Sequence, residues 1–152
     1  MFDLYSGVGL FAVSVAMAFG GRVTAVEGDH AAVTDLQTNA AVAGGRIDPV
    51  HQSVEQFVHD ASGRGVRVPP AHRVPPDVVI ADPPRTGLSR EVLDGIVALR
   101  ASKVVYVSCD VATLARDARR LVDDGYAIRR IDAFDLFPNT PHIETVVVFE
   151  KV

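Results

Sequence analysis

The chain has 152 residues, of which 48% are hydrophobic and 22% are charged, and its net charge is -4 at pH 7. This length suits one domain with a proper core, and the acidic balance means that binding to nucleic acid would need a local basic patch or another domain. The single cysteine, Cys109, excludes an intramolecular disulfide and fits a reducing compartment. No apolar stretch is long enough to predict a membrane span. The N-terminal sequence "MFDLYSG" does not have the pattern of a signal peptide.

The first third of the chain predicts strand, helix, strand and helix in turn. Residues 2–5 predict a short strand, and the loop "SGVG" leads into an apolar helix over 10–19 that a Gly-Gly pair ends. Residues 22–27 predict a second strand. Asp29 is placed to cap the next helix. The buried face of that helix is spaced i, i+3, i+7, i+10 and comprises Val33, Leu36, Ala40 and Ala43.

The middle of the chain gives weaker signals. Residues 47–51 predict a short strand, and residues 54–59 predict a short helix. Residues 62–76 are rich in Gly, Pro and Arg and predict a surface loop. Residues 77–82 predict a buried strand. The helix that follows has apolar positions spaced i, i+4, i+7, namely Val92, Ile96 and Leu99.

The last third predicts strand, helix and two further strands. Residues 103–109 predict a buried strand that ends at the cysteine, and Asp110 is placed to cap a helix. The inner face of this helix is predicted to comprise Val111, Leu114, Ala115, Ala118, Leu121 and Val122. Residues 126–134 and 143–151 predict two strands whose short connection favours antiparallel pairing.

This alternation predicts an α/β fold with a mostly parallel sheet and helices on both faces. The closing antiparallel pair makes the sheet mixed. In such folds, ligands bind at the carboxyl ends of the strands, near the point where the strand order reverses. The glycine loop, Glu27, Asp82 and Cys109 all follow or end predicted strands. We therefore expect them to gather at one edge of the sheet.

The glycine loop and Glu27 together indicate a nucleoside ligand. Gly7 and Gly9 allow the backbone to approach a ligand closely, and the helix that follows points N–H groups at it. Glu27 ends the second strand, at the spacing where an acidic side chain accepts hydrogen bonds from ribose hydroxyls. This pattern fits a nicotinamide dinucleotide and S-adenosylmethionine equally well.

Three further side chains occupy positions that a purely structural role does not explain. Asp82 precedes two prolines, which make a rigid turn and hold the carboxylate at the sheet edge. Cys109 would ordinarily be a small buried side chain, but it lies just before a capped helix, where the helix N-terminus favours a thiolate. Glu144 begins an apolar strand, where a carboxylate is costly unless it lies at a pocket rim or is paired. His142 is either a loop histidine or a proton carrier.

Five segments together resemble the RNA uracil-C5 methyltransferases, the family that makes 5-methyluridine in transfer and ribosomal RNA. "DLYSGVGLF" is similar to the cofactor loop of this family, "VEG" to its ribose-binding acid and "ADPPRTGL" to its Asp-Pro-Pro-Arg motif. "VSCDVATLARD" is similar to its nucleophile motif and "FPNTPHIET" to its general-base motif, and these two are the most specific. The resemblance covers the whole chain and implies a Rossmann-like class I methyltransferase fold.

The resemblance also implies the cofactor and the roles of individual residues. The cofactor is S-adenosylmethionine, with no metal, and its contacts fall on Tyr5, Gly7, Gly9, Glu27 and Asp82. Cys109 is the nucleophile and Glu144 is the general base. In this chemistry the thiolate adds to uracil C6 and makes C5 nucleophilic, and the base later removes the C5 proton. The target base must leave its stack to be reached.

Two positions depart from the family pattern. Asp110-Val111 stand where the family often has Asn-Pro, and Leu10 stands where it often has asparagine. The aspartate keeps the N-cap chemistry, so we expect activity to survive, whereas Leu10 removes one cofactor contact.

The expected domain is a catalytic one. Because the chain enters its first strand at once, we expect residues 1–152 to be the S-adenosylmethionine-dependent domain of a longer protein, without its N-terminal RNA-binding region. That protein would act on tRNA or rRNA in the cytoplasm and not at a membrane. A basic patch within the chain requires one helix to turn its arginines towards the site. The candidates are Arg85, Arg90, Arg116, Arg119 and Arg120.

Three alternatives remain open on the sequence. One is a methyltransferase that acts on an exocyclic amino group oriented by the Asp-Pro-Pro segment and needs neither Cys109 nor Glu144. Another is a nicotinamide-dependent oxidoreductase built on the glycine loop. The third is a cofactor-binding module that has no activity of its own.

Overall fold

The protein is described here from a computed structural model that covers residues 1–64, 75–136, 138–140 and 143–152. Within these residues the chain forms a seven-stranded sheet in the order β3-β2-β1-β4-β5-β7-β6. The strands are β1 (Phe2–Leu4), β2 (Val23–Glu27), β3 (Ile47–His51), β4 (Val78–Ala81), β5 (Lys103–Ser108), β6 (Tyr126–Phe134) and β7 (Glu144–Lys151). The first five are parallel, and β7 lies antiparallel between β5 and β6. The predicted mixed sheet is confirmed.

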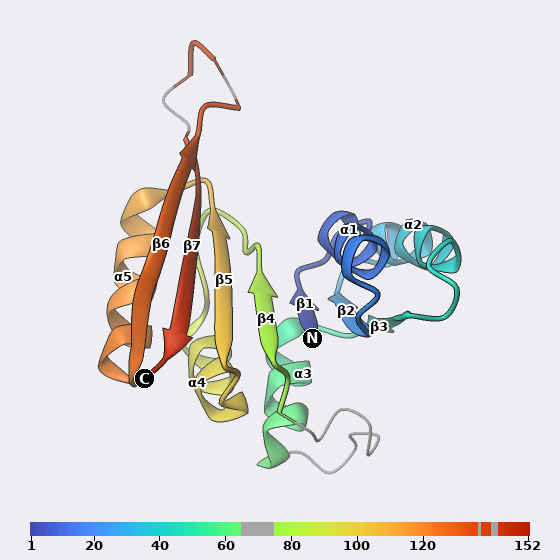
Figure 1. Cartoon of the computed structure of the whole chain (residues 1–152), viewed down its shortest axis with the longest axis horizontal. Helices are drawn as coiled ribbons and strands as arrows, with labels where there is room; N and C mark the ends of the chain where they lie inside the picture. The colour runs from blue at the N-terminus through green and yellow to red at the C-terminus, as the bar shows by residue number, and fades with distance from the viewer. Residues whose placement is uncertain (65–74, 137, 141–142) are drawn as a thin grey trace.

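Helices cover both faces of this sheet (Figure 1). They are α1 (Leu10–Phe19), α2 (His30–Ala41), α3 (Val54–His59), α4 (Arg90–Leu99) and α5 (Val111–Asp123), with a π-helical turn η1 (Asp60–Arg64) after α3. The two helices α1 and α2 pack with β2 and β3 around a small cluster that contains Ala16, Ala25 and Leu36. On the opposite face, α3, α4 and α5 enclose the larger core, in which Tyr106 and Phe149 are fully buried.

Helix ends follow the local sequence signals. The Asp29 side chain accepts a hydrogen bond from the Ala32 N–H and caps α2, as predicted. Gly20 ends α1 with φ of 69°, a left-handed conformation that glycine adopts without strain. The predicted short helix over 54–59 is also present. The predicted loop over 62–76 lies mostly outside the described residues.

The predicted inner face of α5 was wrong at half of its positions. Val111, Ala115 and Val122 are exposed, whereas Leu114 and Leu121 are buried as expected. A further side chain on the inner face is Asp117, which is 0% exposed. Hydrophobicity alone could not indicate this position, because a carboxylate is tolerated in a core only where several donors surround it.

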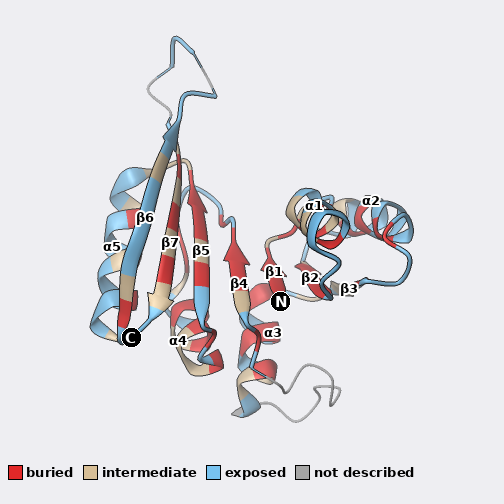
Figure 2. Cartoon of the chain, viewed as in Figure 1, coloured by how far each residue is buried: buried red, intermediate tan, exposed pale blue. Residues whose placement is uncertain are grey.

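Burial is concentrated in the middle of the sheet, and the edge strand β6 is largely exposed (Figure 2). Strand β1 is central: β2 and β3 lie on one side of it and β4 and β5 on the other. The strand order therefore reverses between β1 and β4, which opens a crevice at their carboxyl ends. The loops that follow β1, β2, β4 and β5 all begin at this edge.

Candidate functional site

The loop between β1 and α1 is a tight glycine turn at the carboxyl edge of the sheet. Gly7 and Gly9 have φ of 53° and 93°. A Cβ on Gly9 would lie 2.7 Å from Leu36 Cδ1, so a larger residue there would push the loop away from α2. Gly9 is the N-cap of α1 and provides no side-chain oxygen to the first turn. The first N–H groups of α1 are thus available to a ligand.

Glu27 joins this loop to the end of β2. Its Oε2 accepts the N–H of Gly7 at 2.8 Å, and its Oε1 accepts the N–H of Asp29 at 2.7 Å. Each carboxylate oxygen keeps a second lone pair, so both can also accept hydrogen bonds from a pair of ribose hydroxyls. The structure therefore brings together Gly7 and Glu27, two of the residues predicted to bind the cofactor.

A second carboxylate near the loop is Asp3, which was not predicted from the sequence as a site residue. It is 0% exposed, and neither of its oxygens has a hydrogen-bond partner among the described residues. Burial raises its pKa to about 7; the N–H of Ala12 opposes this shift, and the charges of Asp82 and Glu27 add to it. The available signal was an acidic residue inside an apolar strand directly before a glycine loop.

Asp82 and Glu144 approach each other from two different strands. Asp82 follows β4 at the exposed rim of the crevice, and its N–H donates to the Leu4 carbonyl at 3.3 Å. Its pKa is raised to about 6, mainly by partial burial and to a smaller extent by the negative charge of Glu144. Glu144 is half-buried and begins β7. Two carboxylates that were predicted from separate motifs therefore share one electrostatic environment.

Cys109 and Glu144 lie at the same end of two neighbouring strands. The last pair of the antiparallel register joins Ser108 to Thr145, and Cys109 directly follows Ser108 while Glu144 directly precedes Thr145. The cysteine is half-buried and directly precedes Asp110. Asp110 caps α5 as predicted, and its Oδ1 accepts the Thr113 N–H at 2.8 Å. This bond lowers the pKa of Asp110.

The Ser108 hydroxyl fixes the short connection on which Cys109 lies. It donates to the Asp110 carbonyl at 2.9 Å and lies 3.1 Å from the Asp110 nitrogen, whose N–H it accepts. The strand-to-helix junction is therefore held on both sides of the cysteine. His142, noted in the sequence analysis, lies outside the described residues, as do two other positions of its motif.

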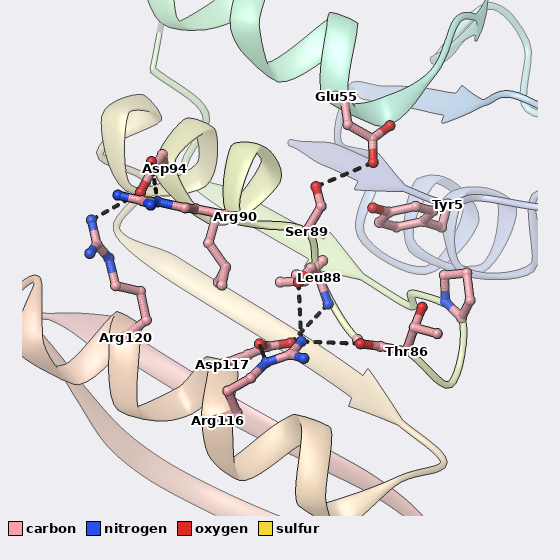
Figure 3. Close-up of a pocket in the computed structure, with 13 residues that line it drawn as sticks. Tyr5, Glu55, Thr86, Leu88, Ser89, Arg90, Asp94, Arg116, Asp117 and Arg120 are labelled. Atoms are coloured by element: carbon pink, nitrogen blue, oxygen red, sulfur yellow. Dashed lines mark hydrogen bonds and ion pairs between the residues drawn. The ribbon is translucent and has the colours of Figure 1, made fainter.

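Tyr5 points into a separate hollow on the α3–α4–α5 side of the sheet (Figure 3). This hollow has a volume of about 660 Å³, and Pro84, Leu88 and Leu93 are among its lining residues. Burial raises the pKa of the Tyr5 hydroxyl, and the nearby charges of Glu55 and Asp117 add to the shift. The backbone of Tyr5, with φ of 61°, still belongs to the glycine loop. A cofactor contact from this residue would therefore come through its main chain.

Four of the five arginines proposed as a basic patch form ion pairs with carboxylates, among them Arg90 with Asp94 at 3.9 Å. Arg116 lies 2.7 Å from Asp117, and Arg119 lies 3.0 Å from Asp123. Arg120 bridges Asp94 on α4 and Asp124, the residue that directly follows α5. Arg90, Arg116 and Arg120 do line the hollow. These ion pairs nevertheless reduce the positive potential that the chain offers to phosphates.

The described residues contain neither a candidate metal site nor a candidate membrane-spanning helix. They contain no cluster of His, Cys, Asp and Glu that could hold a metal ion. None of the helices in the described ranges is long and apolar enough to cross a membrane.

Comparison with known proteins places this chain in a family. The family described as tRNA (Uracil-5-)-methyltransferase matches residues 1–152. A Thermotoga maritima protein described as an uncharacterized RNA methyltransferase is 40% identical over 150 residues, which cover 98% of this chain and 31% of that protein. A Bifidobacterium longum protein described in the same way is 40% identical over 99% of this chain and 34% of its own length. The chain thus spans about a third of these relatives.

Solved structures agree with this assignment. The Pyrococcus abyssi tRNA (uracil-54, C5)-methyltransferase, crystallised with S-adenosyl-L-homocysteine, superposes with a TM-score of 0.78 and is 31% identical. The match covers 97% of this chain and 33% of that one. A precorrin-6y C5,15-methyltransferase from Geobacter metallireducens has a TM-score of 0.73 at 18% identity over 100% of this chain and 78% of its own. The fold is therefore that of the Rossmann-like methyltransferases, as predicted.

Proposed function

This chain belongs to the tRNA (uracil-5-)-methyltransferase family, and we propose that it is the catalytic domain of an S-adenosylmethionine-dependent enzyme that methylates C5 of a uridine in tRNA or rRNA. The observation that carries this proposal is the register of β5 and β7, whose last pair, Ser108 with Thr145, is directly adjacent in sequence to Cys109 and Glu144 at the carboxyl edge of the sheet. Asp82 lies within electrostatic reach of Glu144. In this proposal Cys109 is the nucleophile, Glu144 is the base and Asp82 is a carboxylate of the cofactor crevice.

The residues around the glycine loop fit the proposed cofactor. Glu27 offers two carboxylate oxygens to the ribose hydroxyls, and the first turn of α1 offers backbone N–H groups. Asp82 adds negative charge at the rim of the crevice, which suits a ligand that carries a sulfonium and an ammonium group. When bound, S-adenosylmethionine would supply an electrophilic methyl group, whose bond to sulfur breaks on transfer, and the electron pair of that bond would stay with the neutral thioether S-adenosylhomocysteine.

The remaining steps rest on side chains of this chain. The Cys109 thiolate forms a bond to uracil C6, and the electron pair of the C5–C6 double bond moves to C5 and O4. C5 then takes up the methyl group, and Glu144 accepts the C5 proton. The electrons of the C5–H bond re-form the double bond, and the cysteine leaves C6 as a thiolate. Cys109 directly precedes Asp110, the N-cap of α5, so the reacting sulfur belongs to the junction at the start of that helix.

A trapping experiment on the full-length polypeptide tests the proposal. RNA that carries 5-fluorouridine should remain covalently attached after methyl transfer, because fluorine cannot leave C5 as a proton. A denaturing gel should show an RNA-linked band with wild-type protein and none with Cys109→Ala. If the band survives in Cys109→Ala, the nucleophile assignment is wrong. Full methyl transfer by that variant to ordinary RNA would instead indicate chemistry on an exocyclic amino group.

The base is tested separately with ordinary uridine. Glu144→Gln is nearly isosteric but cannot take the C5 proton, so attack should proceed while release is blocked. We expect RNA-linked protein to accumulate and turnover to fall by roughly 100- to 10,000-fold. Glu91→Gln removes an exposed carboxylate on α4 and is the matched control. Normal turnover by Glu144→Gln would remove this residue from the base role.

A further inference from the structure

Two segments of the proposed site are bound to each other away from the reacting groups. One is the Asp82 loop, residues 82–89, which connects β4 to α4. The other is α5, the helix that follows Cys109. Four side-chain contacts join them over 28 to 30 residues of sequence, and Figure 3 shows those made by Arg116 and Asp117.

Asp117 and Arg116 make three of these contacts. The Asp117 Oδ2 accepts the Leu88 N–H at 2.8 Å. The Arg116 Nη2 donates to the carbonyls of Thr86 at 3.1 Å and Leu88 at 3.2 Å. One turn earlier, the Thr113 hydroxyl lies 3.2 Å from the Arg85 carbonyl. The helix therefore binds the polar backbone groups of the loop directly.

The two side chains also hold each other. The Asp117 carboxylate is 0% exposed and accepts Arg116 Nε at 2.7 Å on Oδ1. Its Oδ2 also accepts the Tyr106 hydroxyl at 2.7 Å. A fully buried carboxylate with three donors is costly to desolvate, and apolar residues of the same volume are often as stabilising. The arrangement therefore indicates a requirement for geometry rather than for stability.

Gly87 shows how closely the loop and the helix approach each other. Its φ is 74°, and a Cβ built on it would lie 2.6 Å from Asp117 Oδ2 and 2.7 Å from Arg116 Nη2. No side chain fits at this position without displacing the pair. The glycine is thus needed for both its conformation and its lack of a side chain.

We propose that Asp117 and Arg116 are positioning residues that hold the Asp82 loop at a fixed distance from the Cys109 junction. The inference rests on the proposed function, because Asp82 belongs to the cofactor side of the site and Cys109 to the uracil side. The methyl donor and the nucleophile must meet on neighbouring atoms of one ring. Reaction requires such groups to lie about 3–3.5 Å from their targets, and a displacement of about 1 Å costs on the order of 100-fold in rate.

Two substitutions break this link in different ways. In Asp117→Asn, the amide oxygen can still accept the Leu88 N–H and the Tyr106 hydroxyl, but the amide NH₂ faces the Arg116 N–H and repels it. Arg116→Ala removes the bonds to both loop carbonyls, and its side chain is 56% exposed, so little packing is lost. Tyr106→Phe is the matched control, because it takes one donor from the same carboxylate without touching the loop.

The experiment measures single-turnover methyl transfer and cofactor affinity in the full-length polypeptide. We expect Arg116→Ala and Asp117→Asn to lower the transfer rate by 10- to 100-fold while the Kd for S-adenosylmethionine changes less than threefold. Tyr106→Phe should lower the Tm and leave the transfer rate within threefold of wild type. Millimolar guanidinium should restore part of the rate in Arg116→Ala and none in Asp117→Asn.

Several outcomes would overturn the positioning role. Wild-type rates in both variants would show that the loop and the helix need no link. An equal loss of rate in Tyr106→Phe would show that only general stability matters. An inactive wild-type protein would instead refute the proposed function, and the role of the pair would fall with it.

Discussion

Replacement of Asp3 by asparagine should make the cofactor-free protein more stable at alkaline pH and change little in acid. The carboxyl is fully buried without a hydrogen-bond partner among the described residues, and its pKa is about 7 in the folded protein against 3.8 in the unfolded chain. Below pH 3.8 both states hold the proton, so the group does not affect the unfolding equilibrium. Between these two values only the unfolded chain releases it, and the free energy of unfolding falls as pH rises.

The size of the effect follows from the two pKa values. One pH unit corresponds to about 1.4 kcal/mol, so the full shift costs the folded protein up to ~4 kcal/mol above pH 7. Roughly 3 kcal/mol of this loss falls between pH 5 and pH 8. Asparagine cannot ionise, so Asp3→Asn escapes the loss. The difference in stability between variant and wild type should therefore grow by roughly 3 kcal/mol over this range.

Urea unfolding at pH 5 and pH 8, without cofactor, measures this difference. Asp35→Asn removes an exposed carboxylate from α2 and controls for the change in net charge. The carboxyl carbon of Asp3, followed by NMR, should titrate near pH 7. If Asp3→Asn shifts the free energy of unfolding equally at both pH values, the buried carboxyl does not have a raised pKa in the folded protein.

Three further predictions follow from other contacts. The pH below which S-adenosylmethionine binding is lost, measured by calorimetry, should be lower in Glu144→Gln than in wild type. The reason is that the charge of Glu144 helps to raise the pKa of Asp82 to about 6. An unchanged pH dependence would contradict this coupling. Gly95→Ala should lower the free energy of unfolding in urea by about 1–3 kcal/mol, because overpacking is costly and the new Cβ would lie 2.4 Å from Val58 Cγ2. Gly21→Ala is the control, since Gly21 has open space around it. Equal effects of the two substitutions would contradict the packing argument. The 152 residues alone, with 15 basic and 19 acidic side chains, should bind unmodified RNA weakly and with a shallow salt dependence in filter-binding assays; tight binding would show that the paired arginines still reach phosphates.

Local signals in the sequence determined most of the secondary structure. Caps such as Asp29 and Asp110 and the stop at Gly20 act within one helical turn, so their effect does not depend on the rest of the fold. The alternation of strands and helices likewise predicted the mixed sheet and the edge at which Glu27 and Cys109 lie. The resemblance to a known family predicted the roles of the site residues, which cannot be inferred from the spacing of apolar residues.

Only the tertiary structure decided how the charged groups of the site are satisfied. Asp117 is buried because Tyr106, 11 residues before it, and Leu88, 29 residues before it, supply donors. The apolar pattern of α5 therefore predicted an inner face that includes the exposed residues Val111, Ala115 and Val122. The burial of Asp3 was not predicted for a related reason. Whether a side chain of β1 is buried depends on the strands that lie on either side of β1, and only the fold shows which strands these are. A cap or a helix period acts between near neighbours, whereas the free energy of a buried charge depends on groups that only the fold brings together.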